Sequence, residues 1–362
     1  MGFNLKKMIC SVCILILSQN YVHAQSLEKR LEQLSESAAK YYLSPLVNTF
    51  GANINSGWLT TPPEKKILGL DIELGVVGMG SYFDESQDFF QSEGTFRFSE
   101  DEAANLTASI DDPVIREQVV QQIIREDFNI LIFGPSIIGS NSRNIQVMFA
   151  PDGAEDFKVS DPQYPFPVYV KLPSQLIDLG VPGFLDNFPM MPSAVPQIKI
   201  GTLYGTRMLL RYLPSIDAHE DIGKMGMFGI GLQHNPGVWF KSPLPVDVSV
   251  GFLKQNFSVE NLVNVSAMSY GVNVGKTFSF GWIALTPFAG YLRSSSSAEI
   301  NYSRDIETDA GIQTVKINFK MDGENKDVFN LGVNFRFLFV NLVADYNFAK
   351  YNSFTAGMFF SF

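Results

Sequence analysis

The sequence has 362 residues, and its 27 Lys and Arg against 37 Asp and Glu give a formal net charge of −10 at pH 7. Nucleic acid is a poor partner for such an acidic chain, so we do not expect DNA- or RNA-binding functions. Hydrophobic residues make up 46% of the chain and 31 residues are Phe, yet after residue 24 no apolar run is long enough for a membrane-spanning helix.

The first 24 residues have the parts of a secretory signal peptide: a basic start at Lys6 and Lys7, an apolar core of about ten residues, and a small-residue cleavage site ending at Ala24. The core is too short for the roughly 20 residues of a membrane anchor. Cys10 and Cys13 both lie in this segment, so the exported chain would have a formal charge of −12 and no cysteine. Disulfides, thiolate nucleophiles and cysteine metal sites are thereby excluded.

Residues 25–48 form the first predicted unit of the exported chain. Apolar residues recur there at spacings of three and four: Leu27, Leu31, Leu34 and Ala38. This spacing predicts an amphipathic helix over 26–43 that ends before Pro45. Its apolar face must pack on something, and two interpretations stay open: a cap on the periplasmic mouth of a barrel, or a plug inside the lumen.

Residues 49–362 are dominated by segments in which apolar and polar side chains alternate. The clearest is the last, whose apolar positions are Phe354, Ala356, Met358, Phe360 and Phe362. The same period of two recurs at 68–76, 198–211, 228–233, 246–252, 268–275, 329–337 and 340–348. It is less clear at 50–60, 94–98, 143–149, 167–173, 281–292, 298–304 and 311–321.

An exported chain with this alternation, and with no helices to cover a second face, is typical of a transmembrane barrel. Lipid offers no partner for an unpaired backbone group, so only a closed sheet can cross it with strands. We therefore predict an all-β fold, a transmembrane antiparallel up-and-down β-barrel of about 14 strands, in a range of about ten to sixteen.

Two long irregular insertions are predicted in this barrel, at 84–142 and 172–196. In the first, Asp111 and Asp112 as a cap, Pro113 and an apolar stripe predict a short helix that ends at Arg125 and belongs to a loop or to a second element inside the lumen. The second is apolar but too rich in proline for a paired strand. It has two open interpretations: a surface that captures an apolar ligand, or a lid that seals the barrel mouth. The candidate ligand-binding residues are Leu176, Phe184, Leu185, Phe188, Met190 and Met191.

Charged residues of both signs fall on the predicted inner face of the strands. The cations are Lys199, Arg207, Arg211 and Arg336, and the anions are Asp71, Glu73, Asp247 and Asp345. Charges inside a narrow barrel can pair across it and stabilise the wall. Alternatively, Arg207 and Arg211 hold the carboxylate of an amphipathic substrate.

The sequence offers little for catalysis or metal binding. After the signal segment only His219 and His234 remain, and no serine has the setting of a nucleophile elbow. We predict that the protein is not an enzyme and needs no cofactor or metal, although Asp84, Glu85 and Asp88 leave a surface calcium site open.

Four stretches resemble one known group of proteins: Tyr42-Leu43-Ser44-Pro45-Leu46, Asn55-Ser56-Gly57-Trp58, the run from Gly229 to Asn235, and the run from Leu244 to Val248. They resemble an uncharacterised family of outer-membrane proteins from Bacteroidota and related bacteria. That resemblance implies a barrel related in architecture to the FadL-type transporters of hydrophobic compounds, which carry an N-terminal hatch inside the barrel. The sequence has no match to that hatch sequence.

These observations favour passive transport of small hydrophobic compounds, fatty-acid-like or aromatic, across the outer membrane. The alternative is a structural or assembly-related outer-membrane barrel without a conducting path, and a more remote one is a lipid-modifying enzyme. The expected partners are outer-membrane lipid, a hydrophobic ligand, and the barrel-assembly machinery, which would recognise Phe360 and Phe362 at the end of the last strand.

Overall fold

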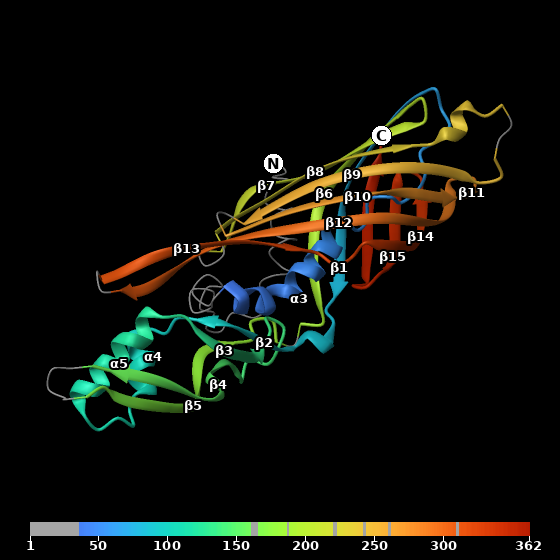
Figure 1. Ribbon diagram of the computed structural model, residues 1–362. Coiled ribbons are helices and arrows are strands. Elements are labelled where there is room, and N and C mark those ends of the chain that lie inside the picture. Colours follow the sequence, from blue (N-terminus) through green and yellow to red (C-terminus); the bar gives the residue numbers. More distant parts are fainter. Residues whose placement is uncertain are drawn as a thin grey trace.

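The structure is a computed structural model that describes residues 36–160, 166–186, 188–219, 223–241, 244–259, 262–308 and 311–362 (Figure 1). Its largest feature is a closed ring of ten antiparallel strands. In order around the ring these are β10 (Val263–Gly275), β9 (Asp247–Val259), β8 (Gly223–His234), β7 (Thr206–His219), β6 (Met190–Leu203), β1 (Leu68–Tyr82), β16 (Ser353–Ser361), β15 (Val340–Phe348), β14 (Asp327–Phe337) and β12 (Ile283–Thr308), which pairs with β10 again. The predicted all-β antiparallel barrel is confirmed.

The ring has ten strands, which is the lower end of the predicted range of about ten to sixteen and fewer than the expected number of about 14. Two short or peripheral strands, β11 (Phe278–Phe280) and β13 (Gly311–Asp322), pair with β12 beside the ring. Four more strands form a separate sheet, and residues 50–54, predicted as part of a strand, are helical. Alternation identifies the two faces of a strand but not the sheet it joins, because both sheets bury one face.

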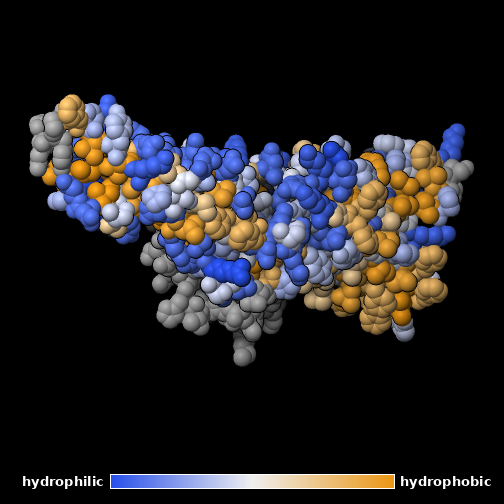
Figure 2. All heavy atoms as spheres, turned by 60° about the horizontal axis from the view of Figure 1, so that its bottom comes forward, coloured by the Kyte–Doolittle hydropathy of each residue, from blue (hydrophilic) through white to orange (hydrophobic). Residues whose placement is uncertain are grey.

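The outer surface of the ring is apolar. On β15 and β16, for example, the exposed positions include Leu342, Phe348, Met358 and Phe360, whereas the polar residues between them are buried inside the ring. Figure 2 shows apolar side chains gathered over the barrel part of the molecule. This arrangement is the reverse of a soluble barrel and matches a wall that faces lipid.

The two ends of the ring differ. At one end, which we call the short-turn end, tight connections such as Tyr204–Gly205 join the strands, and exposed aromatic side chains gather: Trp239, Phe240, Phe280, Trp282, Phe339 and Phe362. At the opposite, long-loop end lie the β12–β13 hairpin and the whole chain between β1 and β6. In outer-membrane barrels short turns face the periplasm and long loops face outward.

The chain between β1 and β6 folds into a small domain, which we call the inserted domain. Its sheet has the order β2 (Phe89–Phe96), β3 (Phe128–Pro135), β4 (Asn144–Val159), β5 (Val168–Pro182), and it also contains η1 (Glu85–Gln87), α4 (Glu100–Leu106) and α5 (Pro113–Arg125). Phe98, Phe128 and Phe149 pack edge to face or tilted in its core. As predicted, Asp112 caps α5, Pro113 begins it and Arg125 ends it.

The segments predicted as irregular insertions, 84–142 and 172–196, are therefore largely ordered strands and helices. Residues 172–182 belong to β5, and 190–196 belong to β6, despite four prolines. The prolines are tolerated because β5 is an edge strand of its sheet and because the first half of β6 pairs on one side only, with β1.

The N-terminal helix α3 (Glu36–Ile54) continues through Pro45 instead of ending before it. The helix remains intact because its second half is buried inside the ring, where packing offsets the hydrogen bond that proline removes. The predicted signal peptide (1–24) and the first part of the predicted helix lie outside the described residues. No helix within the described ranges is long and apolar enough to cross a membrane.

Candidate functional site

The interior of the ring is occupied by the chain's own N-terminal region. We call residues 47–60, the second half of α3 and the irregular continuation after it, the luminal segment. Nearly all of its residues are buried, including the polar ones. Its side chains and carbonyls are hydrogen-bonded to at least six of the ten wall strands, through Met191 O, Ser193, Arg211, Ser269, Asn273, Ser295 O, Asn330 and Ser353. These contacts join the segment to wall strands around the ring.

Arg211 on β7 joins the wall to the luminal segment through several contacts. Its guanidinium is fully buried, and it donates to Ser56 O at 2.8 Å and to Ile54 O at 3.4 Å. It also donates to the wall residue Gln197 at 2.7 Å and lies 4.0 Å from the centre of the Trp58 ring. Hydrogen bonds from a charged donor and a cation–π contact are each strong when water is excluded.

Two residues of the luminal segment explain why the chain fits here so closely. Trp58 is 2% exposed and donates from its indole N–H to Ile54 O at 3.1 Å, which folds the ring back against the end of α3. Gly57 has a positive φ of 68°, and a Cβ there would lie 2.6 Å from a methyl carbon of Thr355 on β16. Only glycine meets both conditions.

The inner wall changes character along the barrel axis. In the short-turn half it is polar, with buried side chains such as Gln233, Ser249, Asn273 and Asn341. In the long-loop half, one hydrophobic cluster joins apolar wall residues to Val47, Phe50 and Ile54 of the luminal segment, beside polar wall residues such as Ser193, Ser296 and Ser353. The apolar wall residues of this half include Val195, Leu213, Met227, Val265, Ala267, Ala298 and Ile300. We call this half of the lumen the apolar chamber; α3 fills it.

Two ion pairs lie on the wall at the β1, β6 and β7 strands, and the first of them is buried. Lys199 Nζ is 2.8 Å from Glu73, with the lysine 2% exposed and also 3.8 Å from the centre of the Phe359 ring. Arg207 is 3.8 Å from Asp71. These contacts support the interpretation in which the inner charges pair and stabilise the wall. Of the remaining predicted charges, Asp247 pairs with Lys65 at 3.0 Å, Asp345 accepts from Asn347 at 2.9 Å, and Arg336 is exposed.

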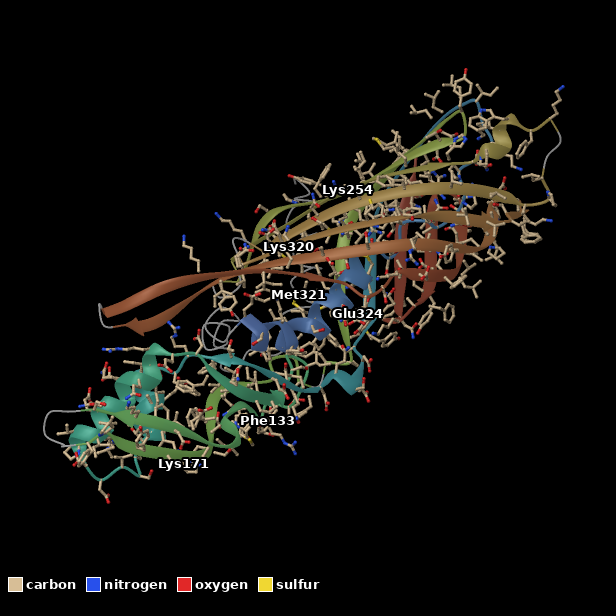
Figure 3. All side chains as sticks on the ribbon, viewed as in Figure 1. Phe133, Lys171, Lys254, Lys320, Met321 and Glu324 are labelled. Atoms are coloured by element: carbon tan, nitrogen blue, oxygen red, sulfur yellow. The ribbon has the colours of Figure 1, made fainter. Side chains whose placement is uncertain are left out.

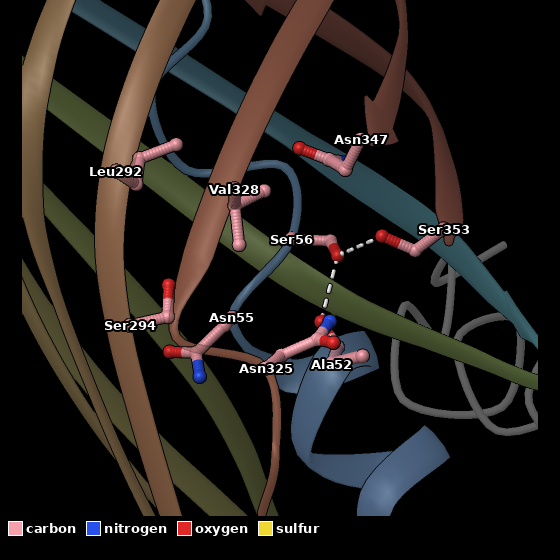
Figure 4. A pocket seen from close by; sticks show the side chains of 9 residues that line it. All are labelled: Ala52, Asn55, Ser56, Leu292, Ser294, Asn325, Val328, Asn347 and Ser353. Carbon is pink, nitrogen blue, oxygen red and sulfur yellow. Dashed lines mark hydrogen bonds between the residues drawn. The ribbon is translucent and has the colours of Figure 1, made fainter. Parts of the chain in front are cut away.

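One small cavity lies between the luminal segment and the strands β12, β14, β15 and β16 (Figure 4). Ser56 and Ser353 are 2.7 Å apart at its edge, and Asn55 and Asn325 project toward it. Its volume of about 10 Å³ is room for roughly one water molecule. A water fits this polar lining, whereas a substrate-sized ligand does not.

The six apolar residues predicted for ligand binding do not form one surface. Leu176 lies on β5 in the inserted domain and is 57% exposed. Phe184, Leu185 and Met191 instead pack, partly buried, against the main core where the inserted domain meets the ring. The other two are Phe188, which is 39% exposed, and Met190, which begins β6. The packed contacts support the interpretation in which this segment seals the barrel mouth.

The residues considered for chemistry lie apart from the lumen. His234 Nδ1 is 2.9 Å from the Thr206 hydroxyl and its ring packs on Trp239, while the side chain of His219 lies outside the described residues. Asp84 caps η1 by accepting from Ser86. No group of three or more His, Cys, Asp or Glu able to hold a metal ion occurs in the described part of the chain.

Comparison with known proteins gives a family but no activity. The structure is similar to a loop-deletion mutant of the outer-membrane protein OmpT of Vibrio cholerae, with 10% sequence identity, 80% of this chain and 99% of that chain covered, and a TM-score of 0.24. It is also similar to the outer-membrane protease OmpT of Escherichia coli (8% identity, 83% and 100% covered, TM-score 0.23) and to the monoaromatic hydrocarbon channel CymD (7% identity, 88% and 97% covered, TM-score 0.21). Scores this low carry no argument about function.

No curated protein matches the sequence. A family model does match it, over residues 5–362, which is nearly the whole chain. The chain therefore belongs to the family of unknown function DUF6588.

Proposed function

We propose that the protein spans the outer membrane with its ten-stranded ring. The strands pair around a closed ring, its outer surface is apolar, and exposed aromatic residues gather at the short-turn end as in an interfacial girdle. In this arrangement the inserted domain and the β12–β13 hairpin face the cell exterior. Outer-membrane lipid and the barrel-assembly machinery would be its partners, with Phe360 and Phe362 as the assembly signal.

We further propose that the barrel passes small hydrophobic compounds, fatty-acid-like or aromatic, and that the luminal segment is the plug that controls this passage. The carrying observation is the apolar chamber. Membrane barrels usually have a polar interior. Here seven wall residues in the long-loop half are apolar, and the chain's own helix α3 packs against them. A compound that replaced Val47 and Phe50 there would find an apolar lining of the kind that ligand pockets use.

The wall also offers an entrance to this chamber from the side. The hydrogen-bond ladder between β6 and β7 ends at the pair Gln197–Arg211, although both strands continue toward the long-loop end. Pro192 and Pro196 of β6 have no N–H to donate, so the described pairs of this stretch are with β1 alone. Two strands without hydrogen bonds can separate at much lower cost than a paired seam.

A specific observation favours the second candidate, a structural barrel without a conducting path. In the short-turn half the luminal segment is tied to the wall by many hydrogen bonds, and the cavity beside it holds about one water. Passage thus requires the plug to move, whereas an anchor for the inserted domain does not. For the remote alternative of a lipid-modifying enzyme, the described side chains offer the Thr206 hydroxyl beside His234 Nδ1, but no described group accepts or donates at His234 Nε2 to orient the ring.

The test is entry of an apolar fluorescent dye into intact cells whose outer leaflet excludes it. Cells that produce the protein should take up the dye faster than cells without it. Met227→Gln, which puts a polar group of similar size into the apolar chamber, should remove most of that gain. Met148→Gln, the same change in the inserted domain, should not. Equal entry with and without the protein would contradict the transport proposal and leave the structural barrel.

A further inference from the structure

Helix α3 is shared between two bodies. Its second half fills the ring, but its first half is held by the inserted domain. Tyr42 is fully buried there: its carbonyl accepts from Ile137 N–H at 3.0 Å and its hydroxyl donates to Pro182 O at 3.1 Å. Next to it the ring of Tyr41 stacks on Phe90 of β2, with 5.8 Å between the centroids and 9° between the planes.

The part of the inserted domain that holds Tyr42 is itself built tightly. The amides of Phe184 and Leu185 both donate to Ile137 O, at 2.9 and 2.6 Å. Gly139 and Gly183 approach so closely that a Cβ on Gly183 would lie 1.9 Å from Gly139 O. Two loops of the domain, before β4 and after β5, are thus joined into one unit around the helix. Because these two loops are packed tightly together, a displacement of the domain also displaces the groups that hold Tyr42.

A second tie joins the domain to the beginning of the luminal segment. Asn48 Nδ2 donates to the Tyr351 hydroxyl at 3.0 Å, and that hydroxyl donates to Gln87 Oε1 in η1, also at 3.0 Å. Burial raises the pKa of the Tyr351 phenol, so it stays protonated and able to donate. Glu324, labelled in Figure 3 beside α3, donates its amide to Asn48 Oδ1 at 3.1 Å and forms an ion pair with Lys350.

From these contacts we propose that the inserted domain controls the position of the plug. A ligand or partner protein that shifts the domain relative to the ring must move or release α3, because the helix is a stiff rod held at one end by the domain and at the other by the wall. Coupling of this kind needs an element whose position both sites bias, and α3 meets that condition through Tyr42 on the domain side and Arg211 on the wall side, with Asn48 joined to both through Tyr351. The inference builds on the proposed gating but does not need a particular transported compound.

The reporter for plug displacement is Ser56→Cys, a position 4% exposed in the lumen. Its rate of labelling by a water-soluble maleimide in intact cells measures how often the luminal segment leaves the wall. Tyr42→Phe removes the hydroxyl bond to the domain and keeps the ring, so labelling should rise about threefold to tenfold, the value of one lost hydrogen bond. Tyr41→Ala should raise it as well, whereas Tyr169→Ala, on an exposed tyrosine of β5, should not.

The opposite perturbation locks the helix to the domain. A Cβ on Gly94 would lie 3.8 Å from the Cβ of Ser37, the spacing of a disulfide, so Ser37→Cys with Gly94→Cys should cross-link on oxidation. Labelling of the reporter should then fall below its rate in the reduced state and recover on reduction. Unchanged labelling in Tyr42→Phe and in the oxidised cross-link, with normal heat-modifiable migration, would show that the ring alone holds the plug and would overturn the proposal. Because labelling needs no transported compound, it separates this failure from a failure of the transport proposal.

Discussion

Replacing Arg211 by methionine should loosen the plug while leaving the ring assembled. The change keeps most of the side-chain volume but removes the donors that reach Ser56 O and Ile54 O and the cation over Trp58. A hydrogen bond to a charged group is worth about 1.5 to 3 kcal/mol, so the two bonds to the luminal segment amount to about 3 kcal/mol at the lower value. The change also removes the desolvation cost of the buried guanidinium in the wall, and this partly offsets the loss of total stability.

A loss of about 3 kcal/mol corresponds to a roughly 100-fold larger population of the displaced plug. Single-channel recording in planar bilayers should then show openings to small ions about 100-fold more often than in the unmodified protein. Arg211→Lys keeps the positive charge but lacks the planar guanidinium. Its frequency of openings should therefore lie between those of the unmodified protein and of Arg211→Met. Arg293→Met, which breaks an exposed ion pair with Asp327 on the outer surface, is the matched control and should leave the open fraction unchanged. An Arg211→Met protein that assembles normally and opens no more often would refute the role given to this residue.

Three further changes test other parts of the account. Lys199→Met should lower the free energy of unfolding by about 3 to 5 kcal/mol because it leaves Glu73 buried without its partner, and Lys199→Met with Glu73→Leu should recover most of it, as measured by urea unfolding in lipid. Deleting Phe362 or replacing it with Asp should reduce assembly in cells far more than its burial explains, because the side chain is 79% exposed and its direct contribution is about 2 kcal/mol or less; normal heat-modifiable migration of both variants would count against an assembly signal. Replacing Phe184, Phe188 and Met191 with Ser should raise leakage of small polar solutes if these residues seal the mouth, and should lower binding of an apolar probe if they capture a ligand.

The strands of the ring could be predicted from the sequence because their outward-facing side chains are apolar and many of their inward-facing side chains are polar. Positions such as Leu342 and Met358 face outward and alternate with buried polar residues, and that period of two needs no tertiary information. The inward direction of Lys199, Arg207 and Arg211 followed from the same alternation. The strand count did not, because the strands of the inserted domain alternate as well, with one face on their own aromatic core.

The helix α3 and the luminal segment could be predicted from the sequence only in part. Helix spacing indicated an apolar face but not the surface on which that face packs. Pro45 suggested that the helix ends before it, whereas the helix continues to Ile54 inside the ring. Asn53, Ser56 and Trp58 belong to the stretch 50–60 that was predicted as a less clear strand, since hydrogen bonds to distant strands leave no local signal. The proline-rich stretch was predicted as irregular because a proline forbids pairing only on the side where its N–H would point, and the sequence does not show that side.

The most direct test of the central claim is a disulfide between the plug and the wall. Ser56 and Ser353 have their hydroxyls 2.7 Å apart, so Ser56→Cys with Ser353→Cys joins the luminal segment to β16. Apolar-dye entry into intact cells should be lost when this pair is oxidised and restored when it is reduced, with no such change in either single variant. Dye entry that continues at the same rate with the cross-link closed would contradict the claim that the luminal segment controls passage through this barrel.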